Sequence, residues 1–338
     1  MGRRIARSDE LADRIASISV TGLLNDRKKM KMAQSNSTRY LIVGAGGSHG
    51  ATGNHVARQL LARGLHVRAF VRKVDARAEQ LKALGAELAV GDLHDFSDVQ
   101  TALDGVQHAY FTYPLADGLL LATANFAVVG TRTGLQSIVN MSQITARPDH
   151  GSPAARQHWL AERVFDWSGI GVTHLRPPFF LENLFNVAAP TVGTEAKMYL
   201  PYGQGRHAPI SGVDIARVAV GILTDPSPHH GKTYVPTGPA ALTMTEQAGV
   251  FSRVLDRGVE YVDIPVERWR QILSTIPVMS PYLIEHLSHV AVSHQNGEFD
   301  VVTEVVETIG GTPPQSIEAF IRDHRTVFEP PRDAHLSA

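Results

Sequence analysis

The sequence contains no cysteine, and its 338 residues carry almost no net charge. Without a thiol the chain forms no disulfide, no thiolate metal site and no cysteine nucleophile. Its 32 basic and 33 acidic side chains give a formal net charge of −1, which offers no basic surface to nucleic acid or to an anionic membrane. The 16 histidines are scattered without the spacing of a metal motif, so no metal site is predicted.

Long apolar runs are also missing, because no segment reaches the roughly 18 residues of a transmembrane helix. Arg3 and Arg4 precede no apolar segment, so the sequence supports no export signal. We therefore expect a cytoplasmic protein that binds neither membranes nor nucleic acid. Residues 1–38 are predicted to form a flexible arm, and residues 331–338 a short tail.

What the sequence does contain is a glycine-rich loop between an apolar strand and an amphipathic helix. Five glycines fall within residues 44–53, directly after the apolar run that starts at Leu41. Glycine has no Cβ and tolerates positive φ, so its backbone can approach a pyrophosphate closely. The free N–H groups and the positive dipole end of the following helix favour the same anion. The loop predicts dinucleotide binding by Gly44, Gly46, Gly47, Ser48, His49, Gly50 and Gly53.

Strand-like and helix-like segments alternate after this loop. Apolar alternation predicts strands at 66–71, 86–90, 109–112, 138–141 and 172–175. Helical periodicity predicts a helix that ends near Gly64 and further helices at 78–84, 99–103, 119–133 and 154–167. This order predicts an α/β fold, with a doubly wound parallel-sheet Rossmann domain over 39–178. Residues 179–330 are predicted to form a smaller α+β region that covers the strand ends, builds the substrate pocket and returns some elements to the core.

The residues that follow the second predicted strand indicate which dinucleotide is bound. A fold specific for NAD usually carries an Asp or Glu there, which hydrogen-bonds the ribose 2′-hydroxyl. This chain has Arg72 and Lys73 instead, and a cation pairs with a 2′-phosphate. We therefore predict NADP(H) as the cofactor, with Arg72 as the main contact and with help from Lys73 and Arg68.

Several segments together make the chain similar to a known family. They are Gly-Ala-Thr-Gly at 50–53 and the stretches at 66–73, 91–95, 175–183, 208–215 and 231–238. In combination they resemble the NmrA-like family of atypical short-chain dehydrogenases/reductases, over residues 39 to 330. The glycine loop is longer than the family pattern, so two frames stay open, Gly44-x-Gly46 and Gly47-x-x-Gly50-x-x-Gly53. The resemblance implies a reductase or an NADP(H)-binding regulator, since the family contains both.

The resemblance also places cofactor contacts at the ends of the later strands. It implies that Asp92 accepts a hydrogen bond from the adenine amino group, and a helix cap or turn role is compatible with this. Residues 112–114 would pass the pyrophosphate and the nicotinamide ribose, and residues 140–142 would lie beside the nicotinamide. The predicted contacts outside the glycine loop are Arg72, Lys73, Asp92, Leu93, Thr112, Tyr113, Pro114, Met141, Ser142, His158 and Pro177.

The catalytic pair of ordinary short-chain dehydrogenases is missing. Those enzymes carry Tyr-x-x-x-Lys, in which the Tyr hydroxyl donates a proton to the carbonyl substrate. Aligned on Glu162, this chain has Ala154 and His158 at the two places, and it has no Tyr between 114 and 198. Ser142 keeps the position of the family serine. Carbonyl reduction with Tyr as the acid is therefore not expected.

Two functions are compatible with such a site. In the first, hydride passes from NADPH to a small apolar planar acceptor, such as a quinone or a conjugated enone, that stabilises its own negative charge. The catalytic residues would then be His158, Ser142 and Tyr113, and the pocket would be lined by Phe179, Phe180, Asn183 and Phe185. In the second, the protein is a non-catalytic NADP(H)-binding redox sensor that acts through a protein partner. A homodimer is open in either case, and Asp214 is predicted to cap the helix that follows it.

Overall fold

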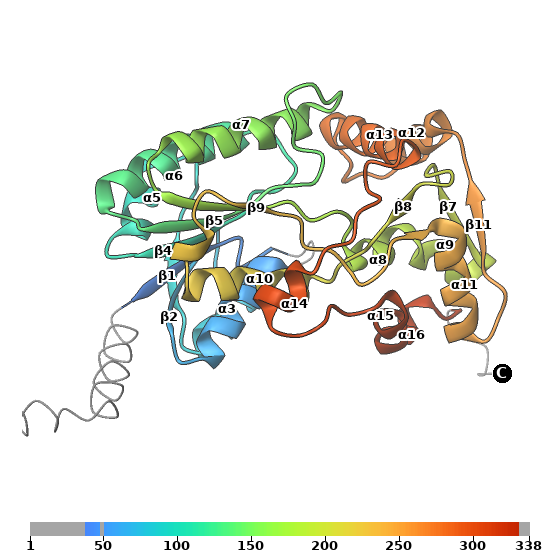
Figure 1. Ribbon diagram of the computed structural model, residues 1–338, viewed down its shortest axis with the longest axis horizontal. Helices are drawn as coiled ribbons and strands as arrows, with labels where there is room; N and C mark the ends of the chain where they lie inside the picture. The colour runs from blue at the N-terminus through green and yellow to red at the C-terminus, as the bar shows by residue number, and fades with distance from the viewer. Residues whose placement is uncertain (1–37, 48–50, 331–338) are drawn as a thin grey trace, which may run out of the picture. The chain divides into compact units, whose positions relative to one another are not determined.

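The folded part of the chain is seen in a computed structural model that describes residues 38–47 and 51–330 (Figure 1). The chain divides into the units Met1–Thr38 and Arg39–Ala338, and the elements described below belong to the second. Residues 1–37 of the predicted arm and the predicted tail lie outside the described residues. Within the described ranges, no helix is long and apolar enough to cross a membrane.

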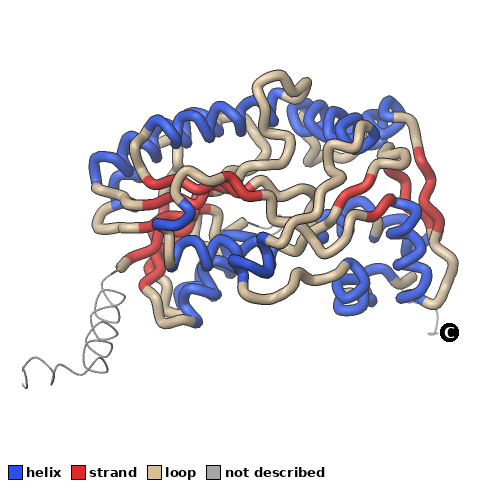
Figure 2. Tube along the Cα trace, viewed as in Figure 1, coloured by secondary structure: helices blue, strands red, loops and turns tan. Residues whose placement is uncertain are grey.

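A sheet of seven strands forms the centre of this unit (Figure 2). Its strand order is β3-β2-β1-β4-β5-β6-β9, and every neighbouring pair is parallel. The carboxyl ends of the strands therefore share one edge, where ligands of such sheets bind. The strands are β1 (Arg39–Val43), β2 (His66–Val71), β3 (Glu87–Val90), β4 (His108–Phe111), β5 (Ser137–Met141), β6 (Gly171–Leu175) and β9 (Thr233–Tyr234).

Helices cover both faces of the sheet (Figure 1). On one face, a buried cluster that includes Ile42, Leu60 and Ile215 joins the sheet to α3 (Thr52–Ala62), α4 (Ala76–Ala83), α10 (Gly212–Thr224) and α14 (Val305–Gly310). On the other face, Phe111, Phe126 and Phe165 belong to the cluster under α5 (Phe96–Leu103), α6 (Leu119–Thr133) and α7 (Pro153–Trp167). The predicted doubly wound α/β fold is confirmed.

A smaller region after β6 has a hydrophobic cluster of its own, which includes Leu200, Phe251 and Phe328. It holds an antiparallel pair, β8 with β10, and a parallel pair, β7 with β11. It also supplies β9, α10 and α14 to the sheet and its layers. Its other elements are η1 (Leu181–Asn183), α8 (Leu184–Val187), α9 (Ala189–Glu195), β7 (Lys197–Leu200), β8 (Arg206–His207), η2 (Ser227–His229), β10 (Leu242–Thr243), α11 (Met244–Leu255), β11 (Glu260–Asp263), α12 (Val266–Ser274), α13 (Pro281–Gln295), α15 (Ile317–Asp323) and α16 (Arg325–Phe328).

Short polar side chains cap the N-termini of several of these helices. At α5 and α10, the capping residue is not the aspartate that the sequence suggested. Asp95, rather than Asp92, caps α5 by accepting hydrogen bonds from the N–H groups of the helix start. Ser211 caps α10 by accepting from the backbone of Asp214. The prediction that Asp214 is the cap is wrong, because its carboxylate lies in the first turn and pairs with Arg217.

Candidate functional site

The glycine loop brings β1 and the start of α3 into backbone contact. Gly44 has a φ of +75°, and a Cβ on it would lie 2.3 Å from the Thr112 side chain at the end of β4. A Cβ on Gly53 would lie 2.7 Å from the carbonyl of Gly44. Both positions therefore require glycine. Gly44 belongs to the first of the two glycine frames left open by the sequence, and Gly53 belongs to the second. Gly46 and Gly47 lie between them, whereas Ser48, His49 and Gly50 lie outside the described residues.

The N-terminus of α3 is open toward this loop. Among the described residues, no side chain caps the helix, so its first N–H groups are available to an anion. Two side-chain contacts hold it in place: the Tyr110 hydroxyl donates to Thr52 Oγ1 at 2.8 Å, and Asn54 Nδ2 donates to the carbonyl of Ala45 at 3.1 Å. The arrangement of loop and helix can hold the pyrophosphate of a dinucleotide.

Arg72 lies at the end of β2, where the sequence predicts the 2′-phosphate contact. Its side chain is 82% exposed, and its guanidinium stands 3.9 Å from the carboxylate of Asp92 beyond β3. Lys73 beside it is exposed. Arg68 is different, because it is buried and donates to the carbonyls of Ala102 and Asp104 at the end of α5. The expectation that Arg68 assists Arg72 is therefore wrong.

Asp92 and Tyr113 belong to one polar network at the ends of β3 and β4. Asp92 Oδ1 accepts from the backbone of His94 at 2.9 Å, as in an Asx turn. The Tyr113 hydroxyl lies 2.9 Å from His94 Nε2 and donates to the carbonyl of Asp117. Burial raises the pKa of Tyr113, so its hydroxyl keeps its proton. Leu93 packs against the second face of the sheet, and Pro114 is exposed at the strand end.

A buried ion pair fixes α7 to the ends of β5 and β6. Arg176 donates two hydrogen bonds to Glu162, at 2.8 and 2.5 Å, and the Glu162 carboxylate is fully enclosed. Burial opposes ionisation, but the bonds from Arg176 outweigh it and hold the pKa of Glu162 below its usual value. From the sequence, Glu162 served only to align the catalytic positions. Its pairing with Arg176 could not be predicted, because the two residues are 14 positions apart in the chain.

Three predicted residues surround this ion pair. Ser142 follows β5, donates its N–H to the carbonyl of Leu175 at 2.7 Å, and has an enclosed hydroxyl whose interaction with Glu162 helps to lower the pKa of that carboxyl. Met141 is buried before it. Pro177 accepts from the backbone of Ile144 at 3.2 Å. These residues therefore meet at the carboxyl edge of the sheet, where the resemblance puts the nicotinamide.

His158 lies on α7, one turn before Glu162 and on the same side of the helix. It is 6% exposed and makes no hydrogen bond with any residue that the structure describes. Burial lowers its pKa to about 4, although the charge of Glu162 opposes the shift. The imidazole is therefore neutral at pH 7, and it acts as a hydrogen-bond donor far more readily than as a proton donor.

Of the four residues predicted to line the substrate pocket, the three phenylalanines are divided between two hydrophobic clusters. Phe180 packs on the first face of the sheet. Phe179 is buried in the C-terminal cluster with its ring 4.9 Å from that of His207. Phe185 lies in the same cluster against Phe320, His324 and Phe328. Asn183 ends a 3-10 turn by donating its N–H to Phe180.

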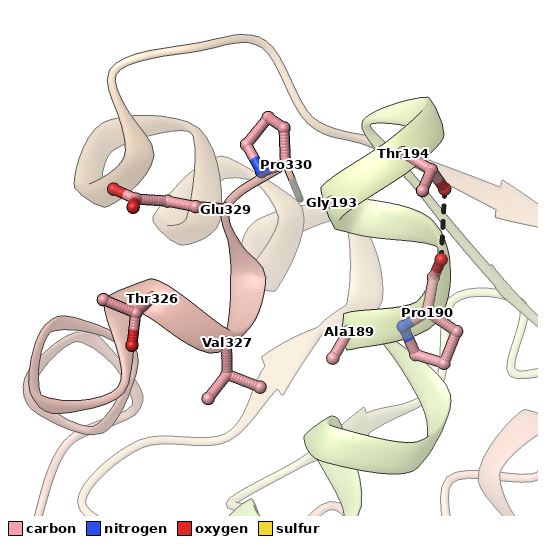
Figure 3. Close-up of a pocket in the computed structure, with 8 residues that line it drawn as sticks. All are labelled: Ala189, Pro190, Gly193, Thr194, Thr326, Val327, Glu329 and Pro330. Carbon is pink, nitrogen blue, oxygen red and sulfur yellow. Dashed lines mark hydrogen bonds between the residues drawn. The ribbon is translucent and has the colours of Figure 1, made fainter. Parts of the chain in front are cut away.

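A cavity of about 690 Å³ lies in the C-terminal region, between α9 and α16 (Figure 3). None of the predicted site residues lines it. Thr194, which lines one side, donates its hydroxyl to the carbonyl of Pro190 in the same helix. Among the described residues, no group of three His, Asp or Glu side chains is arranged to hold a metal ion.

Comparison with known proteins gives a consistent family assignment. A model of the NmrA-like family matches residues 37–321. An NAD(P)H azoreductase of Xenophilus azovorans is 30% identical, over 85% of this chain and 99% of that protein. An NADPH-dependent quinone oxidoreductase of Escherichia coli, solved with NADPH, superposes with a TM-score of 0.75 at 22% identity, covering 86% of this chain and all of that one. The transcriptional regulator NmrA, solved with NADP, gives a TM-score of 0.70 at 19% identity, with 87% and 97% covered.

Proposed function

The chain belongs to the NmrA-like family, and on that premise we propose that it is an NADP(H)-dependent reductase of small, apolar, planar acceptors. The acceptor class is a conjugated, electron-poor group: a quinone, a conjugated enone or an azo group. The observation that carries the proposal is the contact of Gly53 with the Gly44 backbone, because it builds an open backbone cradle under an uncapped helix. The similarity to an NAD(P)H azoreductase also supports a reductase of this acceptor class.

The preference for NADP(H) rests on Arg72. Its guanidinium is free to turn toward a 2′-phosphate, since it is exposed and its contact with Asp92 is long. Val71, Arg72 and Lys73 at the end of β2 include no carboxylate, where a residue specific for NAD would stand, and the next one, Asp75, caps α4. Asp92 would then be left to accept from the adenine amino group.

The residues at the sheet edge suit an acceptor that can itself delocalise the negative charge it receives with the hydride. When bound, NADPH supplies a hydride. The Arg176–Glu162 pair holds α7 in place, the Ser142 hydroxyl interacts with Glu162, and His158 offers a neutral hydrogen-bond donor beside the cofactor site. An oxidised quinone, an enone or an azo group spreads the incoming electron pair over several atoms. Positioning and a neutral donor then suffice, and a proton from water completes the reduction.

The proposal is tested with NADPH fluorescence. Adding the protein to NADPH is expected to change the emission, and adding menadione or an azo dye is expected to cause a protein-dependent decay. Emission that changes but stays constant with several quinones, enones and azo dyes would favour the second function, a redox sensor. The missing Tyr-x-x-x-Lys pair and the neutral His158 are the observations in favour of that alternative.

A further inference from the structure

The glycine turn of the cofactor site is held by a side chain that comes from α3. Asn54 is the third residue of this helix, and its Nδ2 donates to the carbonyl of Ala45 at 3.1 Å. Ala45 follows Gly44, whose carbonyl accepts from the N–H of Gly47 at 2.9 Å and closes the turn. Asn54 therefore fixes the turn without occupying the first N–H groups of α3, which stay available to the pyrophosphate.

The side-chain amide of Asn54 is bonded at both of its ends. Its Oδ1 accepts from Arg58 Nε at 2.7 Å, one turn further along α3. A guanidinium can only donate and a backbone carbonyl can only accept, so a single orientation of the amide satisfies both partners. A carboxylate in this place would have no donor for the Ala45 carbonyl. The two contacts together therefore explain why the position carries an amide.

Arg58 connects this amide to a second helix of the cofactor site. Its terminal nitrogen donates to Gln80 Oε1 on α4 at 2.9 Å, and α4 begins shortly after Arg72. Among the described residues no carboxylate pairs with Arg58, so its side-chain partners are two neutral amides. The contacts Gln80–Arg58–Asn54–Ala45 form a relay. This relay joins the helix behind the expected 2′-phosphate contact to the turn that can hold the pyrophosphate.

We propose that Arg58 is a positioning residue of the cofactor site, which acts through Asn54 to hold the glycine turn in the conformation that binds the pyrophosphate. A turn that is fixed before the cofactor arrives loses less conformational freedom on binding, so the dinucleotide binds more tightly. NADPH and NADH both carry the pyrophosphate, so the two cofactors should gain equally. The inference rests on the cofactor half of the proposed function and does not depend on the acceptor.

Two other roles of Arg58 would have different consequences. If its guanidinium contacted the 2′-phosphate directly, its removal would weaken the binding of NADPH and not that of NADH. If it only stabilised the packing of α3 on α4, its removal would lower Tm and leave the Kd of the folded protein unchanged. A role that acts through Asn54 differs from both, because without Asn54 the loss of Arg58 should have no further effect on binding.

The test is a double-mutant cycle, read by fluorescence titration with NADPH and by competition with NADH. Arg58→Met keeps the aliphatic stem, and we expect it to weaken both cofactors by about tenfold. Asn54→Ala should weaken both by a similar factor. The double variant should bind within about twofold of Asn54→Ala alone. Arg63→Met is the matched control, since it removes the same charge from an exposed position at the C-terminal end of α3, and it should change neither affinity.

The other outcomes contradict the proposal in distinguishable ways. A double variant whose loss equals the product of the two single losses would show that Arg58 does not act through Asn54. A loss confined to NADPH, or a lower Tm with unchanged affinities, would also overturn the proposal. A wild-type protein that binds NADPH but reduces no quinone, enone or azo dye would overturn the reductase function alone, because the cycle is read from binding. A wild-type protein that does not bind NADPH would overturn both.

Discussion

The two hydrophobic clusters on the sheet and the interior of the C-terminal region contain different kinds of side chain. The two clusters on the faces of the sheet are built from Val, Leu, Ile, Ala and aromatic residues that recur with strand and helix periods. The C-terminal region buries His207, His286 and His294 among its apolar residues, whereas the buried His150, His158 and His174 lie outside the two clusters on the sheet. An apolar layer is insensitive to pH, whereas a buried imidazole is stable only as long as it stays neutral. The two apolar clusters and the buried histidines should therefore respond differently to acid and to substitution.

The largest expected effect is acid unfolding caused by the buried histidines, among them three of the C-terminal region. Burial lowers the pKa of His286 to about 3 and that of His294 to about 4, and places that of His207 well below 6.5. The unfolded chain binds more protons below pH 6.5, so stability is lost as the pH falls from there toward the folded-state values. Three such groups lose about 4 kcal/mol for each pH unit. Thermal denaturation from pH 7 to pH 4.5 should show a steep fall in Tm.

His294→Phe sharpens this prediction, because the ring of His294 is stacked between Tyr202 and Phe299 at 4.0 and 3.8 Å. A phenyl ring keeps both stacks and cannot be protonated. The variant should lose the contribution of one buried histidine, about 1.4 kcal/mol for each pH unit between pH 6.5 and 4.5, while His158 and the other buried histidines keep theirs. An unchanged slope would mean that the histidines do not cause the acid sensitivity.

The second effect tests the sheet region through its glycine loop. Gly53→Ala would place a Cβ 2.7 Å from the Gly44 carbonyl and 2.8 Å from that of Val43. Both neighbours are backbone, so α3 must move away from β1 and open the cradle. We expect NADPH binding to weaken by about tenfold or more, measured by fluorescence titration.

Gly249→Ala is the matched control in the C-terminal region. Gly249 lies within α11, and a Cβ there meets only the Arg253 side chain at 3.8 Å. Alanine in a helix interior should raise stability by about 0.5–1 kcal/mol and leave NADPH binding unchanged. Equal effects of the two substitutions on binding would show that the glycine loop is not the cofactor cradle.

This difference between the regions also explains what the sequence could predict. Local periodicity and glycine spacing were enough to predict the βαβ order and the edge of the sheet at which NADP(H) is expected to bind. The structure confirms the doubly wound fold. The Glu162–Arg176 pair and the Ser152–His286 contact join residues far apart in the chain, so no local pattern announces them. Arg68 shows the same limit, because the basic run around β2 does not reveal that this one side chain turns inward.

A third prediction concerns the cofactor specificity of the sheet region. Arg72→Ala should weaken NADPH binding by about 10- to 100-fold, since it removes a charge-assisted contact to the 2′-phosphate. NADH lacks this phosphate, so its affinity should stay the same. Lys82→Ala, an exposed cation on α4, serves as the control. An unchanged ratio of the two affinities in Arg72→Ala would overturn the assignment.

The smallest expected effect concerns two carboxylates of the C-terminal region, Glu182 and Glu246. Their contributions to stability should change with pH in opposite directions. Glu182 Oε1 accepts from the N–H of Gly212, and Oε2 is enclosed without a partner, so burial raises the pKa of Glu182. Its contribution to stability is present at low pH and is lost as the pH rises through the folded-state value. Glu182→Gln keeps a carbonyl acceptor for the N–H of Gly212 and cannot ionise. The Tm of this variant should therefore increase relative to the Tm of the wild-type protein as the pH rises from 4.5 to 8.

Glu246 provides the opposite case in the same region. The backbone N–H of Thr243 in the capping box of α11 lowers the pKa of Glu246, so its contribution is lost as the pH falls. Glu246→Gln should therefore lose Tm relative to wild type above its folded-state pKa, and the difference should vanish in acid. Parallel curves for the two variants would show that neither the burial of Glu182 nor the cap at Glu246 sets the local charge. Divergent curves would show that burial raises the pKa of Glu182 while the exposed capping box lowers that of Glu246, although each carboxylate accepts a backbone N–H.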